Sequence, residues 1–160
     1  MGALSLGRKF MWRTASAADD EAVVSMSVSL YLEDPGSIVV EGNQVRRTIA
    51  KLREDSSRGR VVVCDIDRRV VGYCLLISFW SNELGGEVCV IDELFVAAEY
   101  RGCGLATALL QGLAEGDASL WPSKPAALAL EVSFQNQRAR ALYERLGFQG
   151  KNLAMRRLLS

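Results

Sequence analysis

Residues 101–106 (Arg-Gly-Cys-Gly-Leu-Ala) have the types and the order needed to hold a phosphate group. Gly102 and Gly104 have no side chain, so they adopt backbone angles closed to other residues and leave their N–H groups accessible. The segment lies between an apolar strand pattern that ends at Val96 and a helical pattern of leucines that begins at Leu105. Because the amides at a helix N-terminus attract anions, we expect this glycine loop to bind a phosphorylated ligand.

The glycine loop has two other interpretations. It can be no more than a tight turn between a strand and a helix. It can also be the fingerprint of a dinucleotide-binding fold, which requires a small third residue at position 107 and an acid at a strand end about 20 residues further on. Thr107 stands at that position, and no such acid follows. The dinucleotide interpretation therefore fits poorly.

Composition excludes several other kinds of chemistry. The 160 residues include no histidine, which excludes an imidazole base, a histidine-containing triad and a histidine-bound metal. Basic and acidic residues number 19 each, so no net charge favours nucleic acid or an anionic membrane, and no apolar run is long enough to span one. We expect a cytoplasmic protein without a metal site, because the cysteines have neither metal-ligand spacing nor the density of a disulfide scaffold: Cys64, Cys74, Cys89 and Cys103.

The elements that must position the loop follow from the apolar patterns and the turn residues between them. They predict a single domain over residues 1–160, with residues 1–9 flexible. Runs of β-branched and apolar residues predict strands over residues 10–13, 61–65, 70–79, 87–96, 127–133 and 153–159. Helical periodicity and capping residues predict four helices. The first ends near residue 31, the second covers residues 41–53, the third begins at residue 105 and the fourth covers residues 136–146.

Asn136 and Tyr143 lie seven residues apart and therefore on nearly the same face of the last predicted helix, where one ligand can touch both. Taken alone, Asn136 also fits a helix N-cap and Tyr143 a core tyrosine. Together with the glycine loop and other motifs in the same order, these residues resemble the GNAT superfamily of acyl-CoA-dependent N-acetyltransferases. The other motifs are residues 91–96 (Ile-Asp-Glu-Leu-Phe-Val), Ala139, Leu142, Glu144 and Gly147-Phe148.

The resemblance implies a fold, a co-substrate and a set of contacts. The fold would be α/β (α+β), with a mixed, mostly antiparallel sheet of about 6–7 strands, about four helices and a β-α-β unit that binds acyl-CoA. The co-substrate would be acetyl-CoA, and no metal would be needed. A backbone N–H near residues 94–96 would bind the acetyl oxygen, and the loop amides would bind the pyrophosphate. The implied cofactor-binding residues are Leu94, Phe95, Val96, Arg101, Gly102, Cys103, Gly104, Leu105, Ala106 and Asn136.

The same resemblance implies that Tyr143 is the general acid that protonates the leaving thiolate. A base must also take a proton from the acceptor amine, because an alkyl ammonium is mostly protonated at pH 7. Asp92 and Glu93 are the candidates. Adjacent strand residues point to opposite faces, so only one of them faces the acceptor unless a bulge reorients them. The family pattern favours Asp92, with Glu93 as second choice, and a structural role stays open for either residue.

The acceptor is expected near the join of the first two helices and at one strand end, where the family builds its acceptor pocket. The candidate residues are Tyr31, Glu33, Trp80 and Asn82, although solvated loop side chains are an equal alternative. Acidic and aromatic groups would suit a small cationic amine, similar to a polyamine or an aminoglycoside. The alternatives are acetylation of protein N-termini or lysines, and a sensor domain that binds acyl-CoA without turnover. A homodimer is expected from the family alone.

Overall fold

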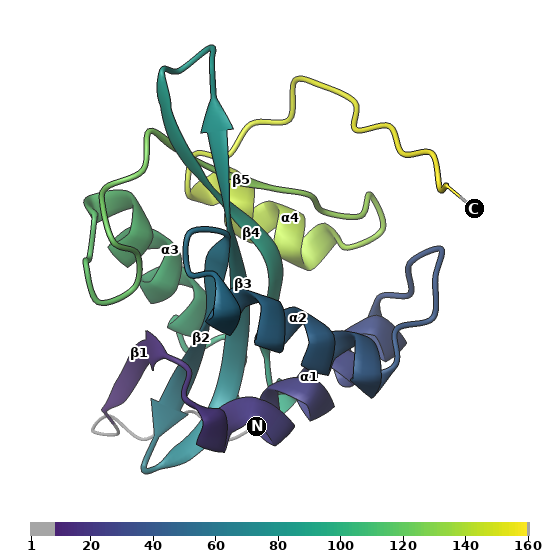
Figure 1. The fold of residues 1–160 in the computed structure, drawn as a ribbon, viewed down its shortest axis with the longest axis vertical. Coiled ribbons are helices and arrows are strands. Elements are labelled where there is room, and N and C mark those ends of the chain that lie inside the picture. The colour runs from purple at the N-terminus through teal and green to yellow at the C-terminus, as the bar shows by residue number, and fades with distance from the viewer. Residues whose placement is uncertain (1–8, 160) are drawn as a thin grey trace.

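A five-stranded sheet in the order β1-β2-β3-β4-β5 forms the centre of the protein (Figure 1). The computed structural model describes residues 9–159, so the flexibility expected for residues 1–9 falls, apart from Lys9, outside the described residues. Neighbouring strands are antiparallel from β1 to β4, and β4 and β5 are parallel. The strands are β1 (Phe10–Thr14), β2 (Gly59–Ile66), β3 (Arg69–Ser81), β4 (Gly86–Val96) and β5 (Ala127–Leu130).

Helices cover both faces of this sheet. The core contacts place α1 (Asp20–Glu33) and α2 (Gly42–Glu54) on one face and α3 (Leu105–Glu115) and α4 (Gln137–Arg145) on the other. The short 3₁₀ turns η1 (Ala17–Asp19) and η2 (Ala98–Tyr100) precede α1 and the glycine loop. The expected mixed, mostly antiparallel sheet with four helices is therefore confirmed. Within residues 9–159, no helix has the length and apolar character needed to cross a membrane.

The position of strand β2 explains why its sequence is apolar without alternation. Val61 and Val63 pack against α1 and α2, whereas Val62 and Cys64 pack on the face covered by α3. All four side chains are buried. A strand that is covered on both faces has apolar side chains on both, so β2 contributes to the core on each side of the sheet.

The first strand is anchored to the element that follows the glycine loop. The indole Nε1 of Trp12, in β1, donates a hydrogen bond to the backbone carbonyl of Leu105, the first residue of α3, at 2.9 Å. Trp12 is 8% exposed and Leu105 is 2% exposed. The start of α3 is thereby fixed against the far edge of the sheet.

Strand β4 is irregular at the point where β5 ends. Leu75 of β3 pairs with Glu93 and Leu76 pairs with Ile91, so Asp92 is an extra residue in a β-bulge. On the other side of β4, pairing with β5 extends only to Ile91. Within residues 9–159, the backbone of residues 92–96 therefore has no neighbouring strand on that side.

The expected strand count is wrong: in the part of the chain that the structure describes, the sheet has five strands where 6–7 were expected. Residues 153–159 form no strand, and their large apolar side chains are exposed, among them Leu153 and Met155. An apolar run forms a strand only where a sheet edge pairs with it, and this segment pairs with none. The strand expected over residues 127–133 ends at Leu130, because β4 turns away at its bulge.

Candidate active site

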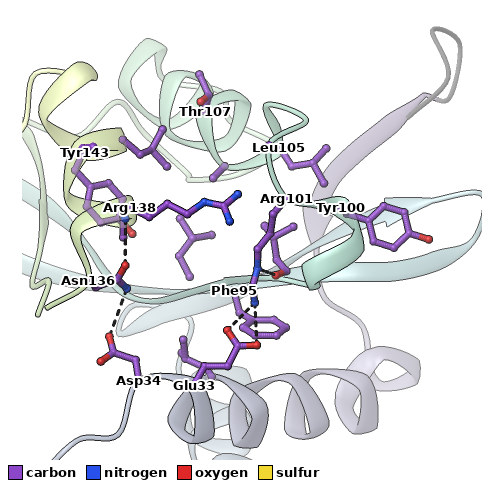
Figure 2. Close-up of a pocket in the computed structure, with 18 of the residues that line it drawn as sticks. Glu33, Asp34, Phe95, Tyr100, Arg101, Leu105, Thr107, Asn136, Arg138 and Tyr143 are labelled. Atoms are coloured by element: carbon purple, nitrogen blue, oxygen red, sulfur yellow. Dashed lines mark hydrogen bonds and ion pairs between the residues drawn. The ribbon is translucent and has the colours of Figure 1, made fainter. Parts of the chain in front are cut away.

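A cleft of about 880 Å³ opens beside the end of β4, beyond the last residue of β5 that pairs with it. The glycine loop and the start of α3 form one wall, α4 forms another, and the end of α1 closes the remaining side (Figure 2). Most residues expected to bind the cofactor line this cleft: Leu94, Phe95, Val96, Arg101, Gly102, Gly104, Leu105, Ala106 and Asn136, together with Tyr143 and Glu33.

The glycine loop presents unused amides to the cleft. Gly102 and Gly104 have φ values of +76° and +81°, in the left-handed region that favours glycine. Within residues 9–159, the N–H groups of Gly102, Cys103 and Gly104 donate no hydrogen bond, and the first turn of α3 adds amides that have no intrahelical acceptor. A Cβ at Gly104 would meet no atom within 4 Å, so there is open space beside the loop. The segment can hold an anion.

Cys103 is half-buried, and its Sγ lies 3.6 Å from the backbone carbonyl of Arg101, to which it donates. Its side chain is not among those that line the cleft. Any contact from this residue to a ligand would come from its backbone.

The Arg101 side chain turns toward α1. Its Nε donates to the carbonyl of Val96 at 2.7 Å, and its Nη2 lies 3.0 and 2.7 Å from the two carboxylate oxygens of Glu33. Its guanidinium also lies over the ring of Phe95, 5.3 Å from the centroid. These contacts occupy much of the guanidinium, so phosphate binding by this side chain stays a prediction.

Arg138, in the first turn of α4, was missed by the sequence analysis. Figure 2 shows its side chain extending across the cleft toward the glycine loop, and a Cβ on Gly102 would lie 3.9 Å from its Nη2. It has no hydrogen bond or ion pair with any residue between 9 and 159. An uncompensated guanidinium beside unused amides suits a phosphate. Its spacing from Leu142 and Arg145, which also line the cleft, is the helical signal that could have identified it.

Tyr143 projects into the cleft from α4, and its ring packs edge-on against Phe148 at a centroid distance of 5.8 Å and an angle of 63°. Its hydroxyl makes no hydrogen bond with the part of the chain that the structure describes. Burial, and secondarily the nearby Cys74 thiol, raise the pKa of Tyr143 to about 12. The phenol therefore keeps its proton at neutral pH and is free to donate it.

Asn136 acts as the cap of α4. Its Oδ1 accepts a hydrogen bond from the Ala139 amide at 3.1 Å, and its Nδ2 donates to Asp34 at 3.5 Å. Because the residue also lines the cleft, the capping role does not prevent contact with a ligand. The N-cap interpretation is therefore confirmed, whereas ligand binding stays a prediction.

The bulge separates the two acidic candidates for the base. The Asp92 side chain reaches solvent, but the protein atoms around its carboxylate desolvate it in part. This desolvation and the negative charge of Glu131 raise the pKa of Asp92, while Arg156 opposes the shift. Glu93 is half-buried and accepts hydrogen bonds from three hydroxyl groups. Neither residue is among those that line the cleft, whose lining on β4 begins at the next residue, Leu94. A carboxyl with a raised pKa is the better proton acceptor near neutral pH.

The residues expected to bind the acceptor divide into two groups. Tyr31 donates a hydrogen bond to Glu93 at 2.8 Å, and Glu33 lines the cleft. Trp80 pairs with Glu87 near the tip of the β3–β4 hairpin, and Asn82 lies in its turn. Trp80 is therefore about 16 Å along the strand from the bulge. The structure does not bring Trp80 and Asn82 to the cleft.

Among residues 9–159, no group of three or more histidine, cysteine or acidic side chains is arranged to hold a metal ion. The contacts available in the cleft are amides, a guanidinium, a phenol and carboxylates. Amides and a guanidinium can bind a phosphate group, and a phenol and carboxylates can transfer protons.

Comparison with known proteins identifies the class that this fold and cleft define. Residues 28–148 match the model of the acetyltransferase (GNAT) family. The chain therefore belongs to the GNAT family of N-acetyltransferases.

Two uncharacterized N-acetyltransferases of Methanocaldococcus jannaschii are similar in sequence. One is 33% identical over 94 residues, or 57% of this chain and 39% of the relative. The other is 36% identical over 91 residues, or 57% of this chain and 53% of the relative. The matched part thus spans about half or less of each relative.

Solved structures share the fold over nearly the whole chain. A possible acetyltransferase from Clostridium difficile 630 has a TM-score of 0.76 and 21% identity, over 94% of this chain and 97% of that one. An aminoglycoside N-acetyltransferase in complex with CoA has a TM-score of 0.68 and 15% identity, over 98% of this chain and 99% of that one. At these identities the likeness establishes the fold alone.

Proposed function

We propose that this protein transfers the acetyl group of acetyl-CoA directly to the primary amine of a small cationic molecule. One observation carries the proposal. The unused amides of the glycine loop and the unbonded Tyr143 hydroxyl face the same cleft, whose lining on β4 begins at Leu94, two residues after Asp92 in the bulge. This arrangement supports anion binding and proton donation within the cleft and proton acceptance beside it.

The residues present fit acetyl-CoA. The amides of Gly102 to Gly104 and the Arg138 guanidinium would hold its phosphates, since both are donors without partners among the described residues. When bound, acetyl-CoA supplies an acetyl group activated as a thioester. The backbone of residues 94–96 lacks a strand neighbour on the β5 side, so an N–H there is available to the acetyl oxygen, where negative charge develops.

Asp92 would accept a proton from the acceptor amine, and Tyr143 would donate one to the leaving group. Asp92 takes a proton from the acceptor ammonium, and the neutral nitrogen attacks the thioester carbon. A carbon–nitrogen bond forms and the carbon–sulfur bond breaks. Tyr143 donates its hydroxyl proton to the departing sulfur, and the second proton of the nitrogen returns to the Tyr143 oxygen through solvent. The raised pKa of both residues suits these roles.

Charge near the bulge favours a cationic acceptor. Asp92, Glu93 and Glu131 contribute negative charge there, and Arg156, whose Nη2 lies 3.8 Å from a Glu131 oxygen, compensates only part of it. A partly buried negative region selects cations over neutral or anionic molecules. A peptide N-terminus or lysine carries the same reactive group, so peptides belong in the test.

The test is thiol release from acetyl-CoA by the purified protein across polyamines, aminoglycosides, amino acids and short peptides. We expect release that depends on a cationic small amine and is lost in Tyr143→Phe and Asp92→Asn. Glu115→Gln, at the exposed end of α3, is the control and should match the wild type. Acetylation of peptides but of no small amine would overturn the acceptor class. Acetyl-CoA binding without release by any amine would favour the sensor function.

A further inference from the structure

A half-buried carboxylate beside the cleft is held by hydroxyl groups alone. Glu93 Oε2 accepts hydrogen bonds from Ser27 Oγ at 3.1 Å and from the Tyr73 hydroxyl at 2.7 Å, while Oε1 accepts from the Tyr31 hydroxyl at 2.8 Å. Glu93 has no ion pair with any lysine or arginine between residues 9 and 159. A charged group removed from water normally requires a cation or strong donors.

The three donors come from rigid parts of the core. Ser27, on α1, and Tyr73, on β3, are both 0% exposed, and Tyr31 lies one helical turn after Ser27. Burial, together with the Glu93 charge, raises the pKa of both tyrosines well above the ordinary value, so each phenol remains a donor. Three neutral hydroxyls therefore donate to the Glu93 carboxylate and fix its position.

The arrangement leaves one position open. The two carboxylate oxygens together offer about four lone-pair directions, of which the hydroxyls occupy three. The remaining direction is on Oε1. Glu93 lies directly between Asp92, at the bulge, and Leu94, which lines the cleft. The Tyr31 hydroxyl, which donates to Oε1, is close enough to Asp92 for that carboxylate's charge to raise its pKa, so an ammonium bound at Oε1 would be near the residue that takes its proton.

We infer that Glu93 binds the ammonium group of the acceptor and holds it near Asp92, which then takes its proton. Ser27, Tyr31 and Tyr73 are positioning residues that hold the Glu93 carboxylate in place. This inference rests on the proposed acetyl transfer. It gives two adjacent acids different roles: the raised pKa of Asp92 suits proton removal, whereas Glu93, whose carboxylate is held by three hydroxyl donors, recognises a cation. The substrate class is narrowed to amines that are protonated at neutral pH.

Two amines of similar size, one cationic and one neutral, test the inference. Ethylamine is protonated at pH 7, whereas 2,2,2-trifluoroethylamine is mostly neutral. At saturating acetyl-CoA, we expect Glu93→Gln to lower kcat/KM for ethylamine by about tenfold or more, because a charge-assisted hydrogen bond is lost. The value for the neutral amine should fall by less than about threefold. Tyr31→Phe, Tyr73→Phe and Ser27→Ala should shift the ratio of the two values in the same direction by a smaller factor.

Ser29→Ala is the matched control, because the Ser29 hydroxyl donates to the Ser25 carbonyl on the same helix and not to Glu93. Its ratio should equal that of the wild type. An equal fall for both amines in Glu93→Gln, or a fall in thermal stability with an unchanged ratio, would overturn the inference and leave Glu93 as a structural residue. Loss of kcat with unchanged KM would also overturn it, because Glu93 would then be the base.

A second measurement does not depend on turnover. Ethylguanidinium stays charged and is not acetylated, and its binding to the CoA-bound protein can be followed by NMR. We expect Glu93→Gln to weaken it about tenfold and Ser29→Ala to leave it unchanged. Equal binding by wild type and Glu93→Gln would overturn the inference. Ethylguanidinium binding that requires Glu93, in a protein that acetylates no amine, would instead count against the proposed transfer alone.

Discussion

Arg101 and Glu33 form an ion pair across the cleft, with Nη2 2.7 Å from the nearer carboxylate oxygen. The pair joins the glycine loop to the last residue of α1. Their side chains are 28% and 48% exposed, so the pair contributes about 0–1 kcal/mol to stability at most. Its larger effect is electrostatic, because it places a carboxylate in a cleft that we expect to hold phosphates.

Removal of that carboxylate should strengthen cofactor binding. In Glu33→Gln the cleft loses a negative charge, and the Arg101 guanidinium is released from its partner. We expect the Kd for CoA, measured by calorimetry, to fall by about two- to fivefold, and the gain to shrink at high salt. A weaker complex would show instead that Glu33 holds Arg101 in the geometry that binding requires.

The unpaired guanidinium of Arg138 should contribute strongly to acetyl-CoA affinity. We expect Arg138→Gln to raise the Kd about tenfold and to reduce its salt dependence, because one charge-assisted contact is lost. Arg140→Gln is the control: that arginine pairs with Glu144 on the exposed side of the same helix. An equal loss in both variants would indicate a general charge effect of α4 rather than a phosphate contact.

Substitution of Tyr143 should affect chemistry far more than binding. Tyr143→Phe keeps the edge contact with Phe148 but removes the hydroxyl, so kcat should fall by about 10²–10⁴ with little change in the Kd for acetyl-CoA. Because the pKa of Tyr143 is raised to about 12, its deprotonation should not limit the wild-type rate below about pH 10. A wild-type rate that falls near pH 8 and is flat in Tyr143→Phe would contradict this assignment.

The pH dependence of kcat should reveal the ionisation of Asp92, and substitution of its charged neighbours should shift it. The rate requires ionised Asp92, so kcat should fall as the pH drops through its raised pKa. Glu131→Gln removes a negative charge and should move this limb to lower pH, whereas Arg156→Gln should move it to higher pH. The other polar or charged groups near Asp92 are Glu93, Tyr31 and Cys74. Shifts of the same sign in both variants would exclude Asp92 as the titrating base.

The raised pKa of Asp92 should lower the free energy of unfolding at neutral pH. A raised pKa in the folded state means that the folded protein binds more protons than the unfolded chain between the ordinary aspartate pKa and the raised one. Stability therefore falls as the pH rises through that window. We expect the free energy of unfolding of Asp92→Asn to exceed that of the wild type at pH 7, with a smaller difference below the ordinary aspartate pKa. Urea titrations at several pH values measure both effects.

Local signals in the sequence predicted residues of the glycine loop and of α4 that line the cleft. Gly102 and Gly104 stand where positive φ angles are needed, and the seven-residue spacing of Asn136 and Tyr143 places both on the cleft. These features depend on one loop and one helix. Residue types and short-range spacing are sufficient for them.

The acceptor side depends on pairing between distant segments, and the sequence did not determine it. The bulge at Asp92 arises from the register between β3 and β4, so side-chain alternation alone could not assign Asp92 and Glu93. Ser27 and Tyr73 reach Glu93 from 66 and 20 residues away. Leu153 to Leu159 has strand-like residues but lies outside the sheet, because no edge pairs with it.

The hydrogen bond from Trp12 to the Leu105 carbonyl also gives the molecule an internal optical probe. The indole is buried and bonded to the first residue of the helix that follows the glycine loop. Trp121 is also buried, but its indole donates to Glu87 on β4, and Trp80 is 67% exposed near the distant hairpin tip. A ligand that rearranges the loop amides changes the field at the Trp12 indole without touching it. The intrinsic fluorescence of the unlabelled protein should therefore follow occupancy of the phosphate site, with Trp12→Phe removing the signal.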